Sequence, residues 1–104
     1  MNPSKVSRQR LFHLTDLPNI GPAMAADLQS LGIQRPDDLR HRNPYALYEQ
    51  LCQQTGQRHD PCVIDIFISV VRFMAGEPAQ AWWAYTTERK QTLASREVDE
   101  EPHD

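Results

Sequence analysis

The stretch Leu14–Ile33, which reads LTDLPNIGPAMAADLQSLGI, decides the expected fold of this 104-residue chain. At its centre is a turn over residues 18–22 that contains two prolines and a glycine. Asn19 and Gly21 are residue types that readily accept positive φ angles, so we expect both to do so here. Ile20 stands between them and is expected to be buried beneath the turn. The turn therefore predicts a tight hairpin between two helices.

A second helix is predicted to follow the turn directly. Pro22 suits the first helical position, where a missing N–H costs nothing, and Gly32 suits the residue just after a helix end. The apolar residues between them recur with helical spacing. They are Ala25, Ala26, Leu28 and Leu31.

This turn resembles the helix-hairpin-helix motif of DNA-binding and DNA-repair proteins, whose core runs leucine-proline-glycine-isoleucine-glycine-proline. The resemblance implies contact with the DNA backbone, because the N–H groups of Gly21, Ala23 and Met24 converge at a helix N-terminus that favours an anion. Asn19 replaces the first glycine of the motif. Ala23 and Met24 stand where many DNA-binding members carry a basic and a hydroxyl residue. A hairpin of this kind also serves simply to join two packed helices, so both readings stay open.

The remaining elements are also predicted to be helical. Before the hairpin, Ser7 can cap a helix over about 8–15 that buries Leu11, Phe12 and Leu14. After it come a short turn started by Pro36 and a helix that opens at Asn43-Pro44 and ends before Gly56. Asp60-Pro61 opens the most hydrophobic helix, which runs to Met74 and ends at Gly76, and a last helix is expected over 78–90. The prediction is an all-α domain of five or six helices over residues 8–90, with a flexible arm at 1–7.

Within the hydrophobic helix, three polar residues form one narrow stripe. Asp65, Ser69 and Arg72 are spaced i, i+4 and i+7 on an otherwise apolar cylinder. The burial expected for this helix rests on Phe67, Val70, Val71 and Met74.

By this point the resemblance extends over about 11–90. The quoted run, followed by DL, NPYALYEQLC, HDPCVID and AWW, resembles the small bacterial pathogenicity locus family, some of whose members are labelled mitomycin-resistance proteins. The hairpin also resembles the C-terminal domain of competence regulators of the TfoX type. The family resemblance implies a link to DNA or DNA damage and no established reaction.

Charge is unevenly distributed along the chain. The net charge is −3, but residues 97–104 hold five acids and no Lys or Arg, so residues 1–96 carry 11 basic residues against 9 acidic ones. We expect residues 91–104 to form a disordered acidic tail. The densest basic cluster is Arg35, Arg40 and Arg42 with His41, which is expected to be a second phosphate contact beside the hairpin.

Three cysteine and histidine residues form a separate constellation. Cys52, His59 and Cys62 have C-x6-H-x2-C spacing, which suits zinc or a thiol nucleophile. A fourth ligand and an orienting group are not evident, so we favour buried thiols over a catalytic or zinc site, and expect no stoichiometric metal and no cofactor. Cys62 stands near a helix N-terminus, where a thiolate is stabilised.

The functional hypothesis is a non-enzymatic, sequence-independent and weak DNA-binding module. Its alternative is a protein–protein adaptor that uses Trp82 or Trp83. No secretory leader or membrane span is evident in the sequence, so we expect a cytoplasmic protein. The DNA-contacting residues are predicted to be Asn19, Ile20, Gly21, Ala23, Met24, Arg35, Arg40 and Arg42.

Overall fold

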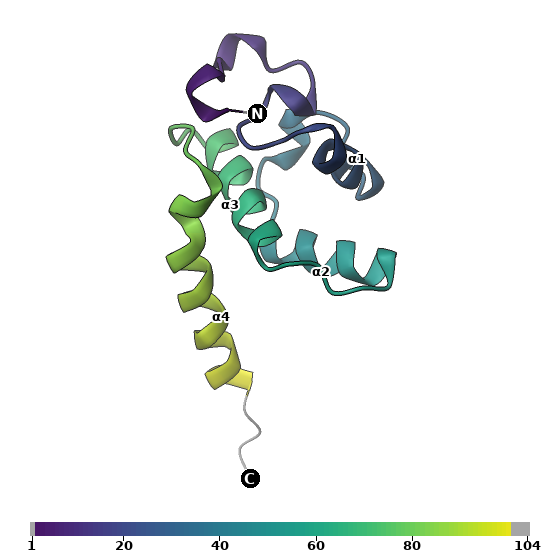
Figure 1. Cartoon of the computed structure of the whole chain (residues 1–104), viewed down its shortest axis with the longest axis vertical. Coiled ribbons are helices and arrows are strands. Elements are labelled where there is room, and N and C mark those ends of the chain that lie inside the picture. The colour runs from purple at the N-terminus through teal and green to yellow at the C-terminus, as the bar shows by residue number, and fades with distance from the viewer. Residues whose placement is uncertain (1, 101–104) are drawn as a thin grey trace.

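The computed structural model describes residues 2–100, and this part of the chain is helical throughout, without a β-strand (Figure 1). The all-α prediction is confirmed. The expected count of five or six helices becomes four α-helices and five short 3₁₀ segments. The α-helices are α1 (Pro22–Ser30), α2 (Pro44–Thr55), α3 (Cys62–Met74) and α4 (Thr86–Glu100). The 3₁₀ segments are η1 (Pro3–Lys5), η2 (Arg8–Arg10), η3 (Leu14–Asp16), η4 (Pro36–Leu39) and η5 (Trp82–Tyr85).

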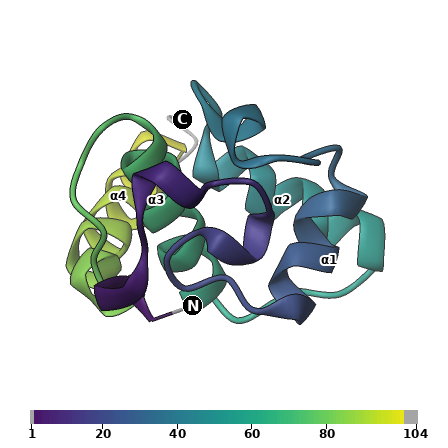
Figure 2. The same cartoon turned by 90° about the horizontal axis from the view of Figure 1, so that it is seen from above.

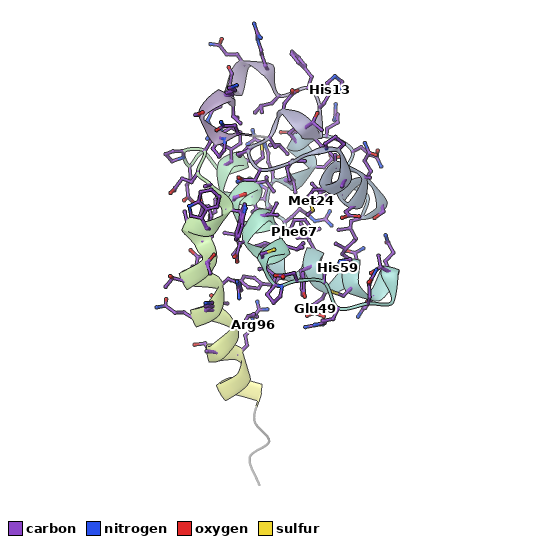
Figure 3. The ribbon with its side chains drawn as sticks, in the orientation of Figure 1. His13, Met24, Glu49, His59, Phe67 and Arg96 are labelled. Carbon is purple, nitrogen blue, oxygen red and sulfur yellow. The ribbon has the colours of Figure 1, made fainter. Side chains whose placement is uncertain are left out.

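Helix α3 is the centre of the fold. It contacts α2, α4, η4 and η5, and Figure 1 shows it between α4 on one side and the α1–α2 pair on the other. Phe67, at the middle of α3 in Figure 3, is fully buried, and Val70 and Met74 are buried as predicted. Val71 is only half-buried, because it lies on a different side of the helix.

The ends of the central helices follow from their capping residues. The Asn43 side chain accepts hydrogen bonds from the N–H groups of Tyr45 and Ala46, which caps the start of α2. Gly56 ends α2 in the left-handed conformation. The buried face of α2 is the predicted one. It consists of Leu47, Tyr48, Leu51 and Cys52.

The helix predicted over 8–15 is wrong. The chain instead forms two 3₁₀ turns, η2 and η3, with an extended residue at His13. The Asp16 carboxylate accepts the N–H groups of Phe12 and His13 at 3.0 and 2.8 Å, so these donors serve a local turn. Leu14 is buried as predicted, but Phe12 is 71% exposed.

The last helix also differs from the prediction. Residues 77–81 are not helical, Trp82–Tyr85 forms η5, and α4 begins at Thr86 and continues past Lys90 to Glu100. Residues 91–100, expected in a disordered tail, are therefore helical here. The remainder of that expected tail, 101–104, lies outside the described residues. At the other end, the expected flexible arm contains η1, and Val6 packs against the core.

No helix within residues 2–100 combines the length and the apolar character needed to cross a membrane.

Candidate nucleic-acid interface

The hairpin turn is built on Asn19, which has a φ of 66° as predicted. Its side-chain amide donates to Ser69 Oγ at 3.0 Å and to the carbonyl of Gln80 at 2.8 Å. Ile20 is fully buried beneath the turn, also as predicted. The Asn19 amide group therefore fixes the turn to α3 and to the segment before η5.

Gly21 does not have the expected positive φ. Its φ of −94° and ψ of −177° are extended values that any residue adopts, because Asn19 alone supplies the left-handed step of the turn. Gly21 is the N-cap residue of α1, and it has no side chain to cap the helix. A Cβ placed on Gly21 would meet no atom within 4 Å, so the space beside this N-cap is open.

The first-turn amides of α1 follow directly. The first intrahelical bond runs from Ala25 N–H to Gly21 C=O at 2.9 Å, which leaves the N–H groups of Ala23 and Met24 without a partner inside the helix. Ala23 is exposed, whereas the Met24 side chain packs against the core, as Figure 3 shows. On the rest of α1, Ala25, Leu28 and Leu31 are buried as predicted, and Ala26 is exposed contrary to prediction. The start of α1 thus offers donors at the positive end of a helix dipole.

The predicted basic cluster lies on and beside η4. Arg40 Nε is 2.6 Å from Asp37 Oδ1, so its charge is largely matched locally. Arg42 is exposed and forms no ion pair with a described side chain. Arg35 and Arg40 line a hollow of about 400 Å³ together with Phe12 and Met74.

The hollow and the hairpin face different sides of α3. The hairpin is fixed to Ser69, while the hollow reaches Met74, five positions later on the same helix. Five residues correspond to a rotation of about 140° and a rise of about 7.5 Å. Figure 2 likewise shows η4 and the turn before α1 on different sides of the molecule. The arginines and the amides therefore do not form one compact phosphate site.

The polar stripe on α3 supplies the tertiary contacts that sequence reasoning missed. Asp65, which is fully buried, accepts hydrogen bonds from Thr86 Oγ1 at 2.8 Å and from Arg89 Nε at 2.9 Å. Arg72, farther along the stripe, pairs with Glu88 at 2.6 Å. The spacing of the stripe was the available signal, but it did not identify partners on α4.

A second contact that the sequence did not predict is made by Arg8. Its guanidinium donates to the carbonyls of Phe73 and Glu77 at 2.8 and 2.6 Å and lies 4.0 Å from the centroid of the Phe73 ring. A cation at this position satisfies carbonyls at the C-terminal end of α3. Arg8 thereby fixes the N-terminal segment to the helix that also holds the hairpin.

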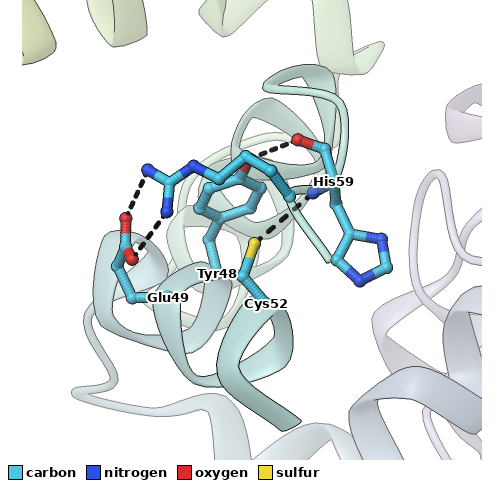
Figure 4. Close-up of polar contacts among 5 residues, drawn as sticks. Tyr48, Glu49, Cys52 and His59 are labelled. Carbon is cyan, nitrogen blue, oxygen red and sulfur yellow. Dashed lines mark hydrogen bonds and ion pairs between the residues drawn. The ribbon is translucent and has the colours of Figure 1, made fainter. Parts of the chain in front are cut away.

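Cys52 and His59 are neighbours, but their geometry is that of a packed corner (Figure 4). The backbone N–H of His59 donates to Cys52 Sγ at 3.5 Å, and the His59 carbonyl accepts the Tyr48 hydroxyl. The His59 ring lies 2.8 Å from Thr55 Oγ1 through its Nε2. The imidazole is thus engaged with a hydroxyl, and only the backbone of His59 reaches the thiol.

Cys62 does not have the activated thiol that a helix N-terminus suggests. Burial raises the pKa of its thiol, and the neighbouring Asp60 carboxylate raises it further. Both cysteines are free thiols. Within residues 2–100, no three His, Cys, Asp or Glu side chains are arranged to hold a metal ion.

The tryptophan pair divides between packing and exposure. The two rings make an edge-to-face contact with centroids 5.5 Å apart. Trp82 is half-buried, whereas Trp83 is 66% exposed. Gln80, which accepts the Asn19 amide, stands only three residues before Trp83, so the exposed ring lies on the segment fixed to the hairpin.

Comparison with known proteins places these features in a family. Residues 7–91 match the family described as "Pathogenicity locus". The chain is also similar to the mitomycin resistance protein McrB of Streptomyces lavendulae, with 43% identity over 86 residues that cover 83% of this chain and 82% of the relative. No solved structure matches. The chain, whose helical core and hairpin all fall within the matched region, therefore belongs to the pathogenicity locus family.

Proposed function

We propose that this chain is a non-enzymatic, sequence-independent DNA-binding module that holds a backbone phosphate at the start of α1. The observation that carries the proposal is the uncapped N-terminus of α1, where the Ala23 and Met24 amides adjoin open space beside Gly21. Such amides bind phosphate oxygens without reading a base. The mitomycin-resistance name of the relative supports a role in resistance to DNA damage.

Rigidity of the hairpin favours this role. Asn19 fixes the turn through two hydrogen bonds, and Ile20 anchors it in the core. The amides are consequently held in place before a ligand arrives, which lowers the entropic cost of binding. In this proposal η3, the turn and α1 act as a helix-hairpin-helix motif whose first helix is reduced to one 3₁₀ turn.

Substitution at Gly21 tests the site. Gly21→Asp places a carboxylate at the N-cap, where it caps the free amides and repels phosphate. We expect the folded protein to gain a few tenths of a kcal/mol of stability and to lose binding to labelled duplex DNA at low salt. Gly21→Asn caps the same amides without a charge, so it should also weaken binding, though less.

Ala26→Asp is the matched control, because it adds the same charge to an exposed position of the same helix beyond the first turn. It should reduce binding only slightly. Equal losses for Gly21→Asp and Ala26→Asp would show that net charge, and not the amide site, determines affinity. Wild-type protein that binds neither duplex nor single-stranded DNA at low salt would reject the proposal.

A protein–protein adaptor is the second candidate, and the exposed Trp83 ring favours it. An adaptor would lose its partner on Trp83→Ala while keeping its DNA affinity and its fold. A DNA module would keep its affinity for duplex DNA only if the Trp83 ring stays outside the interface, so measuring both activities on this one variant separates the two functions.

A further inference from the structure

A cavity of about 140 Å³ lies between α2, α3, α4 and the loop that precedes α3, away from the hairpin. Figure 3 shows Arg96 of α4 at the level of Glu49 and His59, all three of which line this cavity. Ile64 from α3 and Leu93 from α4 supply apolar wall. The volume is close to that of cavities that hold one benzene ring.

One wall residue carries an unsatisfied polar atom. Tyr45 lines the cavity, and its hydroxyl is buried without a hydrogen-bond partner among the described residues. Leaving a buried hydroxyl unpaired destabilises a protein. The neighbouring Tyr48 hydroxyl, in contrast, donates to the His59 carbonyl. Tyr45 is therefore the group that lacks an acceptor at this site.

The two arginines of the cavity differ in how their charge is matched. Arg58 lies over the Tyr48 ring at 5.4 Å, and Glu49 engages it at 2.9 and 3.0 Å, which neutralises it. Arg96 lies over the Tyr45 ring at 4.4 Å and makes no ion pair with a described side chain. An unmatched cation thus stands beside the tyrosine whose hydroxyl lacks an acceptor.

We propose that this cavity binds a small planar aromatic carboxylate about the size of benzoate. Its ring packs on Ile64 and Leu93, and its carboxylate accepts the Tyr45 hydroxyl and pairs with Arg96. A ligand of this class supplies both of the missing partners, the acceptor and the negative charge, and fills the apolar volume. This site is independent of the proposed DNA contact at α1.

Titration of the ¹⁵N-labelled full-length protein with benzoate tests the site. We expect saturable amide shifts confined to α2, α3, α4 and the 56–61 loop, with a Kd of about 1 mM or below. Benzyl alcohol keeps the ring without the charge, and acetate keeps the carboxylate without the ring, so each should bind at least about tenfold more weakly. Equal binding by benzoate and benzyl alcohol, or shifts spread over the whole surface, would overturn the proposal.

Two variants test the polar partners, and a third tests the volume. Tyr45→Phe should weaken benzoate about tenfold and yet raise the melting temperature of the free protein, because it removes an unsatisfied hydroxyl. Arg96→Gln should weaken benzoate similarly, without changing the weaker binding of benzyl alcohol. Leu93→Trp should abolish binding by filling the cavity. If it unfolds the protein, the first two variants still decide the matter.

A structural role for Tyr45 would give a different pattern. The proposal is wrong if Tyr45→Phe leaves benzoate affinity unchanged. It is equally wrong if benzoate produces no shifts at concentrations well above 1 mM, in which case the cavity holds only water.

Discussion

At the residue scale, three polar side chains on α3 hold the rest of the chain to it. Asp65 receives Arg89 and Thr86 from α4, Ser69 receives the hairpin through Asn19, and Arg72 pairs with Glu88. Each contact joins segments that lie far apart in the sequence. The hairpin and α4 are therefore positioned by the same helix, on which a change at one position can affect either neighbour.

Removing Arg89 alone should be more damaging than removing the whole pair. Asp65 is fully buried and Arg89 is mostly buried, so Arg89→Met leaves an uncompensated carboxylate at a cost of about 3–5 kcal/mol. The double variant Asp65→Leu/Arg89→Met removes both charges and should recover most of that loss. Urea unfolding of the three proteins measures the difference. A double variant less stable than Arg89→Met would show that the pair is net stabilising.

A pH dependence is expected at η4. The Asp38 carboxylate accepts the N–H groups of Gln34 and Arg35, and these bonds lower its pKa below the ordinary 3.8. Because the folded pKa is the lower one, this contribution to stability is present above the unfolded pKa and is lost as pH falls through the folded pKa. The urea midpoint of Asp38→Asn should fall less than that of wild type on acidification from neutral pH to below 3.8. Asp37→Asn, which keeps both backbone bonds, should follow wild type.

At the element scale, α3 provides most of the core, and one phenylalanine pair tests that role. Phe67 is fully buried, so Phe67→Ala should destabilise the fold by about 3–5 kcal/mol. Phe12→Ala removes the same atoms from a ring that is 71% exposed and should cost less than about 0.5 kcal/mol. Thermal unfolding of both variants gives the comparison. Similar losses would mean that Phe12 packs in solution in a way that the structure does not show.

The elements that the sequence predicts correctly are those whose ends are set by neighbouring residues. Pro22, the Asn43-Pro44 pair and Gly56 act within one turn of the chain, so the bounds of α1 and α2 follow from local chemistry. The segment before η5 and the start of α4 depend on Asp65 and Ser69, which are distant in sequence. No local pattern indicates where such a helix begins.

The candidate site divides in the same way. The free amides of α1 follow from the hairpin pattern, since they depend only on the turn and Pro22. The inward side chain of Asn19 and the separation of the arginines from the hairpin depend on how both pack on α3. The tyrosine–arginine cavity brings together residues from three helices, and no motif marks it.

At the scale of the whole molecule, the fold is elongated, with extents of 53, 27 and 21 Å. Its two candidate phosphate contacts, the start of α1 and the η4 arginines, lie on different sides of α3. A DNA strand advances about 3.4 Å per nucleotide, so reaching across 27 Å takes about eight nucleotides. Short and long DNA should therefore use different parts of the protein.

This separation predicts that the arginines matter only for long DNA. Arg42→Gln should weaken binding of a duplex of about sixteen base pairs and lower its log–log salt slope by about one unit for each phosphate that is no longer neutralised. Arg40→Gln should have less effect, because Asp37 already matches the Arg40 charge. A trinucleotide spans only about 10 Å, so its affinity should respond to Gly21→Asp and not to Arg42→Gln. Fluorescence anisotropy at low and physiological salt measures all four combinations. Equal weakening of trinucleotide and duplex binding by Arg42→Gln would instead place that arginine beside the hairpin and make the two contacts one site.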